Sequence, residues 1–461
     1  MTASPQPRRP IVHSSGGKKK LFPLPPAIPV LQATCEHSHP SAVIEREPKG
    51  AWQRLIVALL LSTIGGSGFW SAVVALPAIG STFAVDRAEA SLAYAATMVG
   101  YSAGTLLMAK LADRIGICIP LVIGSLMLGL GYIAVALAQS FPLFMLAQAL
   151  LVGLGSASVY TPLVADISHW FGRRRAMAIS ICASGNTLAG ALWSPVLVHF
   201  LNEVGWRDTF VTLGIFCLAT MLPLIVLLRR HAPNPGNIAG AAGTPGEVSA
   251  ATFGFGARRL HVILFIAGIM CCLGMSVPQV HLIAFCRDLG YGATRGADML
   301  SLMMVASLSS RIIFGWSADR IGGLPNLLIG STLQAASLVF YASVSSLSAL
   351  YAVSALFGFV QSGIVPCYAM IVREYFPAHE AASRLAPISV ANFIGMSAGA
   401  WMAGMIFDMT GSYRDAFLNG AFWNAVNIAI VAWLLLRVLR RNASVVPAGA
   451  NLLPRRPLAD C

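Results

Sequence analysis

Long apolar runs alternate with short polar turns along most of the chain. Twelve runs are each long enough to cross the hydrocarbon core of a bilayer as a helix, which takes about 20 residues. They lie at roughly 54–80, 90–110, 117–138, 142–166, 176–201, 209–228, 261–285, 296–317, 324–345, 348–373, 383–407 and 416–437. Because backbone polar groups in lipid must be satisfied within the segment, these runs form helices. The pattern therefore predicts an all-α membrane protein with 12 transmembrane helices.

Composition supports this interpretation and excludes several others. The 461 residues are 56% hydrophobic and only 11% charged, whereas soluble proteins carry about 25% charged residues. The net charge of +13 does not indicate nucleic-acid binding, because the basic residues gather in alternate loops, as membrane topology requires. The cysteines are scattered without a Cys-x-x-Cys pair and there is no phosphate-binding loop, so we expect no metal, no cofactor and no use of ATP.

The distribution of arginine marks one membrane face. Clusters such as Arg173–Arg175, Arg229–Arg230 and Arg258–Arg259 fall in the segments that share a side with both chain ends. The opposite loops carry few arginines, mostly beside acids, as in Arg207-Asp208. The positive-inside rule then predicts that both termini are cytoplasmic. We expect a multi-pass protein of a bacterial inner (cytoplasmic) membrane.

The two halves of the chain repeat one another. Three landmarks recur at a constant offset of about 206 residues: Asp113 and Asp319, Phe171 and Phe376, and Trp206-Arg207-Asp208 and Tyr413-Arg414-Asp415. Two repeats of six helices in the same orientation predict parallel halves, with a binding site between them near mid-membrane. The expected parts are a disordered basic tail (1–51), an N-terminal half (52–230), a cytoplasmic linker (231–258), a C-terminal half (259–440) and a C-terminal tail (441–461).

Arg311 lies well inside the eighth apolar run. The eight positions from Arg311 to Asp319 span about 12 Å of helix, close to half of a bilayer core. A cation there costs at least about 2.5–3.5 kcal/mol, so it faces a protein interior or a wet cavity. Ser307 and Gly315 occupy the neighbouring turns, and no acid lies at mid-depth in the other runs. We therefore expect the counter-charge to be a substrate carboxylate, which a guanidinium binds through two parallel hydrogen bonds.

Five other polar residues lie within the apolar runs as candidates for substrate binding. They are Asn186, Asn392, Gln361, Tyr160 and His281. Asn186 and Asn392 occupy equivalent places in the two repeats, so both amides could orient one substrate. Hydrogen bonding between helices or ordinary packing explains the same residues equally well. His281, near the outer end of the seventh run, fits either a proton-carrying group or a wet residue of an outer gate.

The turn that ends the eighth run carries a recognisable motif. It contains Gly315, Asp319, Arg320 and Gly322, and an earlier copy contains Asp113, Arg114 and Gly116, with Ala109 in place of the first glycine. This pattern resembles the major facilitator superfamily of secondary transporters. The resemblance implies that Asp113 and Arg114 form a latch that closes the cytoplasmic side against a helix N-terminus of the other half, where an anion is favoured. Asp319 and Arg320 would be its symmetric partner. The same charges are also explained by the orientation rule alone.

Within that superfamily the chain is similar to the monocarboxylate transporter group and its bacterial relatives. Arg311, four residues before Gly315, and Trp170-Phe171-Gly172-Arg173 carry this resemblance. Animal members have an acid where Ser307 stands and a lysine in the first helix, which is uncharged here from Gly65 to Trp70. The resemblance implies a monomeric secondary transporter, surrounded by membrane lipid, that moves a small organic anion with protons or by exchange.

Two other kinds of protein remain as alternatives. An exporter of drug-like or other amphipathic solutes would have the same fold, with Arg311 in a structural role. A non-transporting receptor would also use the mid-membrane arginine to bind a ligand. An intramembrane enzyme is disfavoured, because the sequence has no intramembrane pair of aspartates and no Ser/Lys or Ser/His arrangement.

Overall fold

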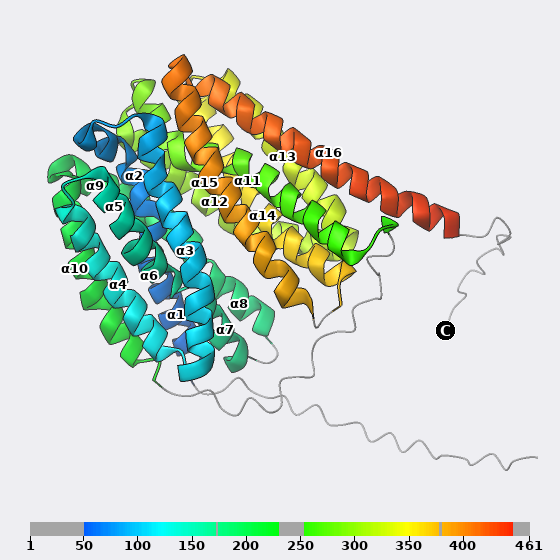
Figure 1. Ribbon diagram of the computed structural model, residues 1–461, viewed down its shortest axis with the longest axis horizontal. Coiled ribbons are helices and arrows are strands. Elements are labelled where there is room, and N and C mark those ends of the chain that lie inside the picture. The colour runs from blue at the N-terminus through cyan, green and yellow to red at the C-terminus, as the bar shows by residue number, and fades with distance from the viewer. Residues whose placement is uncertain (1–49, 172–173, 230–252, 378–379, 446–461) are drawn as a thin grey trace, which may run out of the picture. The chain divides into compact units, whose positions relative to one another are not determined.

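The computed structural model describes residues 50–171, 174–229, 253–377 and 380–445. Within these ranges the chain is helical and contains no strand (Figure 1). Twelve helices or groups of helices are long and apolar enough to cross a membrane. They match the twelve predicted runs and confirm the predicted fold class. The predicted N-terminal tail and linker, apart from their last residues, and most of the C-terminal tail lie outside the described ranges.

The N-terminal half supplies six spans, three of which are interrupted. The spans are α1 (Ala51–Gly65) with α2 (Ser67–Phe83); α3 (Arg87–Ile115); α4 (Cys118–Leu137); α5 (Phe141–Ala147), η1 (Gln148–Gly153), α6 (Leu154–Ala157) and α7 (Thr161–Trp170); α8 (Arg175–Ala183) with α9 (Gly185–Glu203); and α10 (Gly205–Val226). The break at Gly66 coincides with close packing, because a Cβ atom there would lie 2.6 Å from that of Ala189. Pro162 lies in the first turn of α7, where its missing N–H costs no helical hydrogen bond.

The C-terminal half supplies six uninterrupted spans. They are α11 (Ala257–Asp288), α12 (Gly292–Ile321), α13 (Gly323–Ser343), α14 (Leu347–Tyr375), α15 (Ala381–Thr410) and α16 (Tyr413–Val445). Successive spans run in opposite directions. We call the face at which α1 begins and α16 ends the terminal face, and the face at which α3 begins and α11 ends the far face.

The sequence repeat is reproduced in backbone geometry. Gly116, after α3, has φ 80° and ψ 167°, and Gly322, after α12, has φ 85° and ψ 166°. Gly205 and Gly411, which precede the Trp-Arg-Asp and Tyr-Arg-Asp landmarks, have φ values of 82° and 68°. Glycine suits all four turns because it adopts positive φ without steric cost. Equivalent turns therefore end equivalent helices in the two halves.

Small residues let the spans approach closely. A Cβ atom at Gly100 of α3 would lie 1.9 Å from the carbonyl oxygen of Ala149, and one at Gly358 of α14 would lie 2.0 Å from that of Met303. Such contacts replace the hydrophobic driving force that helices lack in lipid. Large apolar side chains such as Val99 and Ile312 are instead 66% and 77% exposed. This exposed apolar surface is expected of spans that face lipid.

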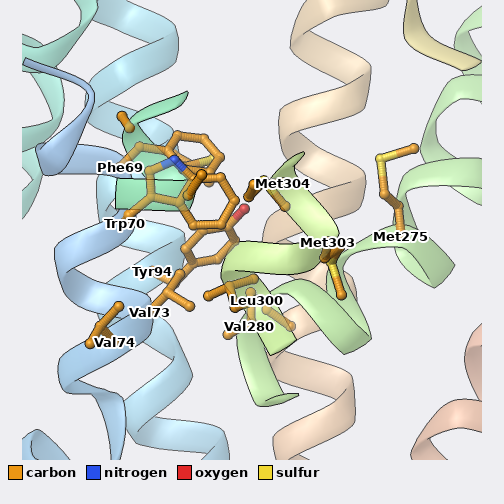
Figure 2. Packing of buried hydrophobic residues seen from close by; sticks show 14 of the residues in the cluster. Phe69, Trp70, Val73, Val74, Tyr94, Met275, Val280, Leu300, Met303 and Met304 are labelled. Atoms are coloured by element: carbon orange, nitrogen blue, oxygen red, sulfur yellow. The ribbon is translucent and has the colours of Figure 1, made fainter. Parts of the chain in front are cut away.

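Buried apolar side chains join the two halves. Figure 2 shows Phe69, Trp70 and Tyr94 of the first half beside Leu300 and Met304 of the second. The rings of Phe69 and Tyr94 meet edge to face, with centroids 5.7 Å apart. Gly190 of α9 makes room for this junction, because a Cβ atom there would contact both Trp70 and Met304. α9 and α12 therefore pack closely about two helical turns from Arg311, on its far-face side.

Candidate functional site

Arg311 lies between the two halves, on α12. It is ten residues before the end of that helix, which is about 15 Å along its axis. Its Nε donates to Ser362 Oγ of α14 (3.0 Å), and its Nη2 donates to Thr187 Oγ1 of α9 (2.9 Å). Ser362 belongs to the same half as Arg311, whereas Thr187 belongs to the other half. The arginine is thus oriented by one hydroxyl from each half.

The guanidinium of Arg311 is not saturated by these bonds. It has five N–H donors, and the two hydroxyls use two of them. Among the described residues, no carboxylate lies within ion-pair distance of Arg311. The side chain is half-buried. The structure therefore provides a mid-span cation with three remaining donors and no carboxylate partner in the part of the chain that it describes.

The helices that carry Arg311 and its partner Ser362, α12 and α14, also carry a hydrogen-bonded network of polar side chains. Ser307 Oγ is within hydrogen-bond distance of the carbonyls of Met303 and Gly358. Gln361 Nε2 donates to Ser307 Oγ (3.4 Å), and Gln361 Oε1 accepts from Gln279. Gln361 thus connects α11, α12 and α14, with one amide N–H and one carbonyl lone pair used within the protein.

The two symmetry-related asparagines have different surroundings. Asn392 is 8% exposed, and its Oδ1 makes no hydrogen bond among the described residues. Asn186 is half-buried and immediately precedes Thr187. Its backbone carbonyl accepts from the indole N–H of Trp70 (3.1 Å). Asn186 thus precedes a residue that contacts Arg311, and its own Oδ1 lies against Gly66, between α1 and α2. Asn392 offers a buried acceptor without a partner among the described residues.

Tyr160 and His281 lie on other parts of the structure. Tyr160 is half-buried and precedes α7, in the terminal-face part of the fourth span. His281 is fully buried near the far-face end of α11. Its Nε2 is 2.8 Å from the carbonyl oxygen of Ala400, and its Nδ1 is 3.1 Å from Tyr413 Oη. The structure therefore places His281 in a far-face network, not in water.

This far-face network ties the two halves together. The carboxylate of Asp408 on α15 accepts from the backbone N–H groups of Arg87 (3.0 Å) and Ala88 (2.7 Å), which begin α3. Arg87 Nη2 donates to Asp288 Oδ1 (2.9 Å), and Arg87 Nη1 donates to Tyr413 Oη (3.0 Å). Each bond joins the first half to the second. The far face is therefore held closed by bonds that must break if the halves separate there.

The predicted latch residues at the terminal face are not engaged in this way. Asp113 and Arg114 are exposed at the end of α3, and neither makes a hydrogen bond or ion pair with another described residue. Arg320 is exposed, and its guanidinium carbon lies 3.9 Å from the centre of the Trp316 ring. The side chain of Asp319 lies outside the described residues. The structure thus brings the halves together at the far face without a latch through Asp113.

One buried ion pair was not found from the sequence. Arg54 of α1 binds Asp166 of α7 through Nε (2.6 Å) and Nη2 (2.9 Å). Its Nη1 donates to the carbonyl of Leu228, and its guanidinium lies 4.6 Å from the ring of Trp170. Arg54 is only 6% exposed. The pair ties the first, fourth and sixth spans together near the terminal face.

Comparison with known proteins identifies the fold. The family model described as Major Facilitator Superfamily matches residues 57–348 and, in a second match, 264–459. The chain belongs to the Major Facilitator Superfamily. It is a transporter and not an enzyme, and its twelve spans make it an integral, multi-pass membrane protein. The family resemblance seen in the sequence is confirmed.

Individual relatives show which members of the superfamily the chain resembles. It is 26% identical over 342 residues to monocarboxylate transporter 13 of Bos taurus, covering 72% of this chain and 76% of the relative. It is 27% identical over 280 residues to the MFS-type transporter pynF of Aspergillus niger, covering 60% and 62%. A crystal structure of a bacterial homologue of the human lysosomal transporter Spinster, inward-facing and occupied, matches 85% of this chain and 96% of its own, with a TM-score of 0.60 and 16% identity. The chain is thus related to monocarboxylate transporters, and the solved structure shares its fold.

Proposed function

We propose that the protein is a secondary active transporter that moves a small monocarboxylate by alternating access, with Arg311 as the anion anchor. The observation that carries this proposal is the position of Arg311 between the halves, bonded to two neutral hydroxyls and, within the described ranges, to no acid. The similarity to monocarboxylate transporters supports the choice of substrate class.

The chemistry of the guanidinium favours a carboxylate. A carboxylate accepts two parallel hydrogen bonds from the fork of an arginine, and such charge-assisted bonds are roughly twice as strong as neutral ones. Ser362 and Thr187 occupy the Nε/Nη2 edge of the fork, which leaves both N–H groups of Nη1 and one of Nη2 for a ligand. A bound anion would also offset the cost of placing a cation at this depth.

Alternating access requires two closed arrangements that exclude one another. The far-face bonds of Arg87 to Asp288 and Asp408 support a state closed at that face. In our proposal they break as the halves 52–230 and 259–440 move, and the terminal face closes instead. Asp113 and Arg114, with Asp319 and Arg320, would then form the latch. We also propose that the terminal face is cytoplasmic, in a bacterial inner membrane, which a reporter fused to the C-terminus would test: a periplasmic reading would contradict it.

The other candidate residues fit this proposal to different degrees. Asn186, next to Thr187, and Asn392, with its unpartnered oxygen, are the best placed to contact a substrate. Gln361 supports Ser307 and thereby the turn of α12 that precedes Arg311. Tyr160 would line the terminal-face route to the site. His281 belongs to the network that closes the far face. Protonation of its ring would change its hydrogen bond to Tyr413.

A second candidate function rests on aromatic rings between the halves. The ring of Tyr101 lies 6.0 Å from Phe69 and 5.6 Å from Phe393, which is on α15 in the other half. Such a wall suits an amphipathic or drug-like solute. An exporter of this kind would not need the charge of Arg311.

Uptake into proteoliposomes separates the two candidates. Purified protein would be tested with labelled lactate, pyruvate, a dicarboxylate and a lipophilic cation, with and without a pH gradient. We expect uptake of a monocarboxylate that Arg311→Gln abolishes and that Arg320→Gln, a charge removed at the terminal face, slows only partly. Transport of the cation with no response to Arg311→Gln would favour the exporter. Stimulation by an inward proton gradient would distinguish proton coupling from exchange.

A further inference from the structure

An apolar groove runs between α11 and α16 on the outside of the second half. It has a volume of about 490 Å³ and is lined by Ile263 and Ile266 of α11 and by Val426, Ala429, Ile430 and Trp433 of α16. No polar side chain is among the lining residues. Ile266, Ala429 and Trp433 are exposed. The groove therefore faces outward, and both helices that line it are membrane spans.

The groove ends at a concentration of arginines. Arg258 and Arg259 begin α11, and Arg437 and Arg440 lie near the end of α16; all four are exposed. Segments 253–266 and 426–441 contain no acidic residue. We call these four residues the arginine cluster. Ile263 is five residues beyond Arg258, and Trp433 is four residues before Arg437, so the groove begins about 6–8 Å from the cluster along the helix axes.

Arg437 connects the cluster to the groove. Its guanidinium carbon lies 4.4 Å from the ring of Trp433, which is part of the groove wall, and 5.4 Å from the ring of Phe255. Those two rings stack on each other with centroids 5.8 Å apart. Nη1 of Arg437 also donates to the carbonyl of Phe253 (3.2 Å). One hydrogen bond and two rings thus fix the arginine at the mouth of the groove, and its other N–H donors have no partner among the described residues.

The segment before α11 keeps both helix ends together. Gly254 has a φ of 82°, which favours glycine. A Cβ atom there would lie 2.7 Å from Nη2 of Arg441, so this guanidinium lies directly against the turn. Arg258 follows four residues later. The turn before α11 therefore holds the basic start of α11 beside the basic end of α16, where both spans leave their apolar segments.

We propose that this surface is a binding site for an anionic phospholipid of the surrounding bilayer. One acyl chain lies in the groove against Trp433 and Ile430, and the phosphate lies on Arg437 with the other arginines around it. Charge complementarity argues for this occupant, because the described segments 253–266 and 426–441 carry arginines and no acid, and a basic surface attracts anionic head groups. A second copy of this chain would bring a like-charged surface to the same place, which disfavours a dimer here.

Native mass spectrometry of delipidated protein tests the proposal. The probes are phosphatidylglycerol and phosphatidylcholine with identical acyl chains. We expect retention of one phosphatidylglycerol per chain in preference to phosphatidylcholine. The double variant Arg437→Gln/Arg440→Gln should weaken retention about fivefold for each arginine removed, whereas Arg114→Gln, an exposed arginine at the end of α3, should not.

The groove is tested separately from the charges. Ala429→Trp fills the groove without changing any charge, and Ala425→Trp places the same side chain one turn earlier, at an exposed position outside the lining. We expect only Ala429→Trp to lower phosphatidylglycerol retention. Equal retention of the two lipids by the unaltered protein would overturn the proposal. The proposal would also be overturned if the arginine variant lost phosphatidylglycerol while Ala429→Trp retained it. A dimer that persists when phosphatidylglycerol is added would overturn it as well.

Discussion

Replacing Asp408 with asparagine tests whether the far-face network holds that face closed. Asp408 comes from α15, yet its carboxylate satisfies the first two N–H groups of α3 in the other half. Asp86, the residue that precedes α3, makes no side-chain cap bond. Asp408 is thus the acid that caps this helix, and it does so only while the halves touch.

The expected loss of stability of the closed far face follows from the hydrogen-bonding groups that asparagine retains. It retains one neutral acceptor and loses the charge, so one charge-assisted bond becomes neutral and the other is lost. An anion at an exposed helix N-terminus is worth about 0.3–1 kcal/mol, and a hydrogen bond adds about 0.5–1.5 kcal/mol. We therefore expect the closed far face to be weakened by about 1–2 kcal/mol. At 1.4 kcal/mol for each factor of ten, the fraction open at the far face should rise about 5- to 30-fold.

Cysteine alkylation measures that fraction on purified protein. The reporter is Ala90→Cys, because Ala90 is 1% exposed and lies next to the network on α3. We expect its alkylation rate to rise in Asp408→Asn relative to the reporter alone. Asp415→Asn is the matched control, since Asp415 is an exposed acid on the same face with no hydrogen bond to the first half. An unchanged rate in Asp408→Asn, or an equal rise in Asp415→Asn, would refute this account of the closure.

Three further predictions concern single contacts. Tyr413→Phe removes the hydroxyl shared by Arg87 and His281; leaving those partners unsatisfied costs about 1–3 kcal/mol, so alkylation of the same reporter should rise, and no rise would show that the hydroxyl is dispensable. Asp166→Asn removes the carboxylate that Arg54 binds and should lower stability by about 3–5 kcal/mol in thermal unfolding, whereas a melting temperature equal to that of Asp415→Asn, a change at an exposed acid, would contradict the buried-pair interpretation. Gly358→Ala should destabilise by about 1–3 kcal/mol or more through contact with Met303, while Gly315→Ala, which meets no atom within 4 Å, should not; equal melting curves would be inconsistent with the packing described.

The fold could be predicted because its signal is long and repeated. Each span needs about 20 apolar residues, and twelve such runs separated by charged turns leave few alternatives. The interruptions were not predicted. The π-helical segment at 148–153 and the break at Gly66 depend on close contacts with other helices, which hydrophobic periodicity does not encode.

The site could be predicted only in part. The depth of Arg311 follows from counting residues along one helix, so the sequence predicted its place in the middle of a span. Its partners could not be identified, because Thr187 is 124 positions away and Ser362 is 51 positions away, and hydroxyls of this kind are common in membrane helices. The pair of Arg54 with Asp166, 112 positions apart, was missed for the same reason. Each charge lies near the end of its span, where charged residues are common, and the orientation rule alone accounts for Arg54.

The central claim is tested most directly by measuring carboxylate binding to purified protein in which only Arg311 is changed. Titration with lactate and pyruvate, followed by ligand-induced thermal shift, would compare the unaltered protein with Arg311→Lys and Arg311→Gln. Lysine keeps the charge but loses the planar fork, so binding should weaken; glutamine should nearly abolish it, since a hydrogen bond to a charged group contributes about 1.5–3 kcal/mol. Arg320→Gln should bind as the unaltered protein does. Undiminished carboxylate binding by Arg311→Gln, in protein of unchanged melting temperature, would contradict the assignment of Arg311 as the anion anchor.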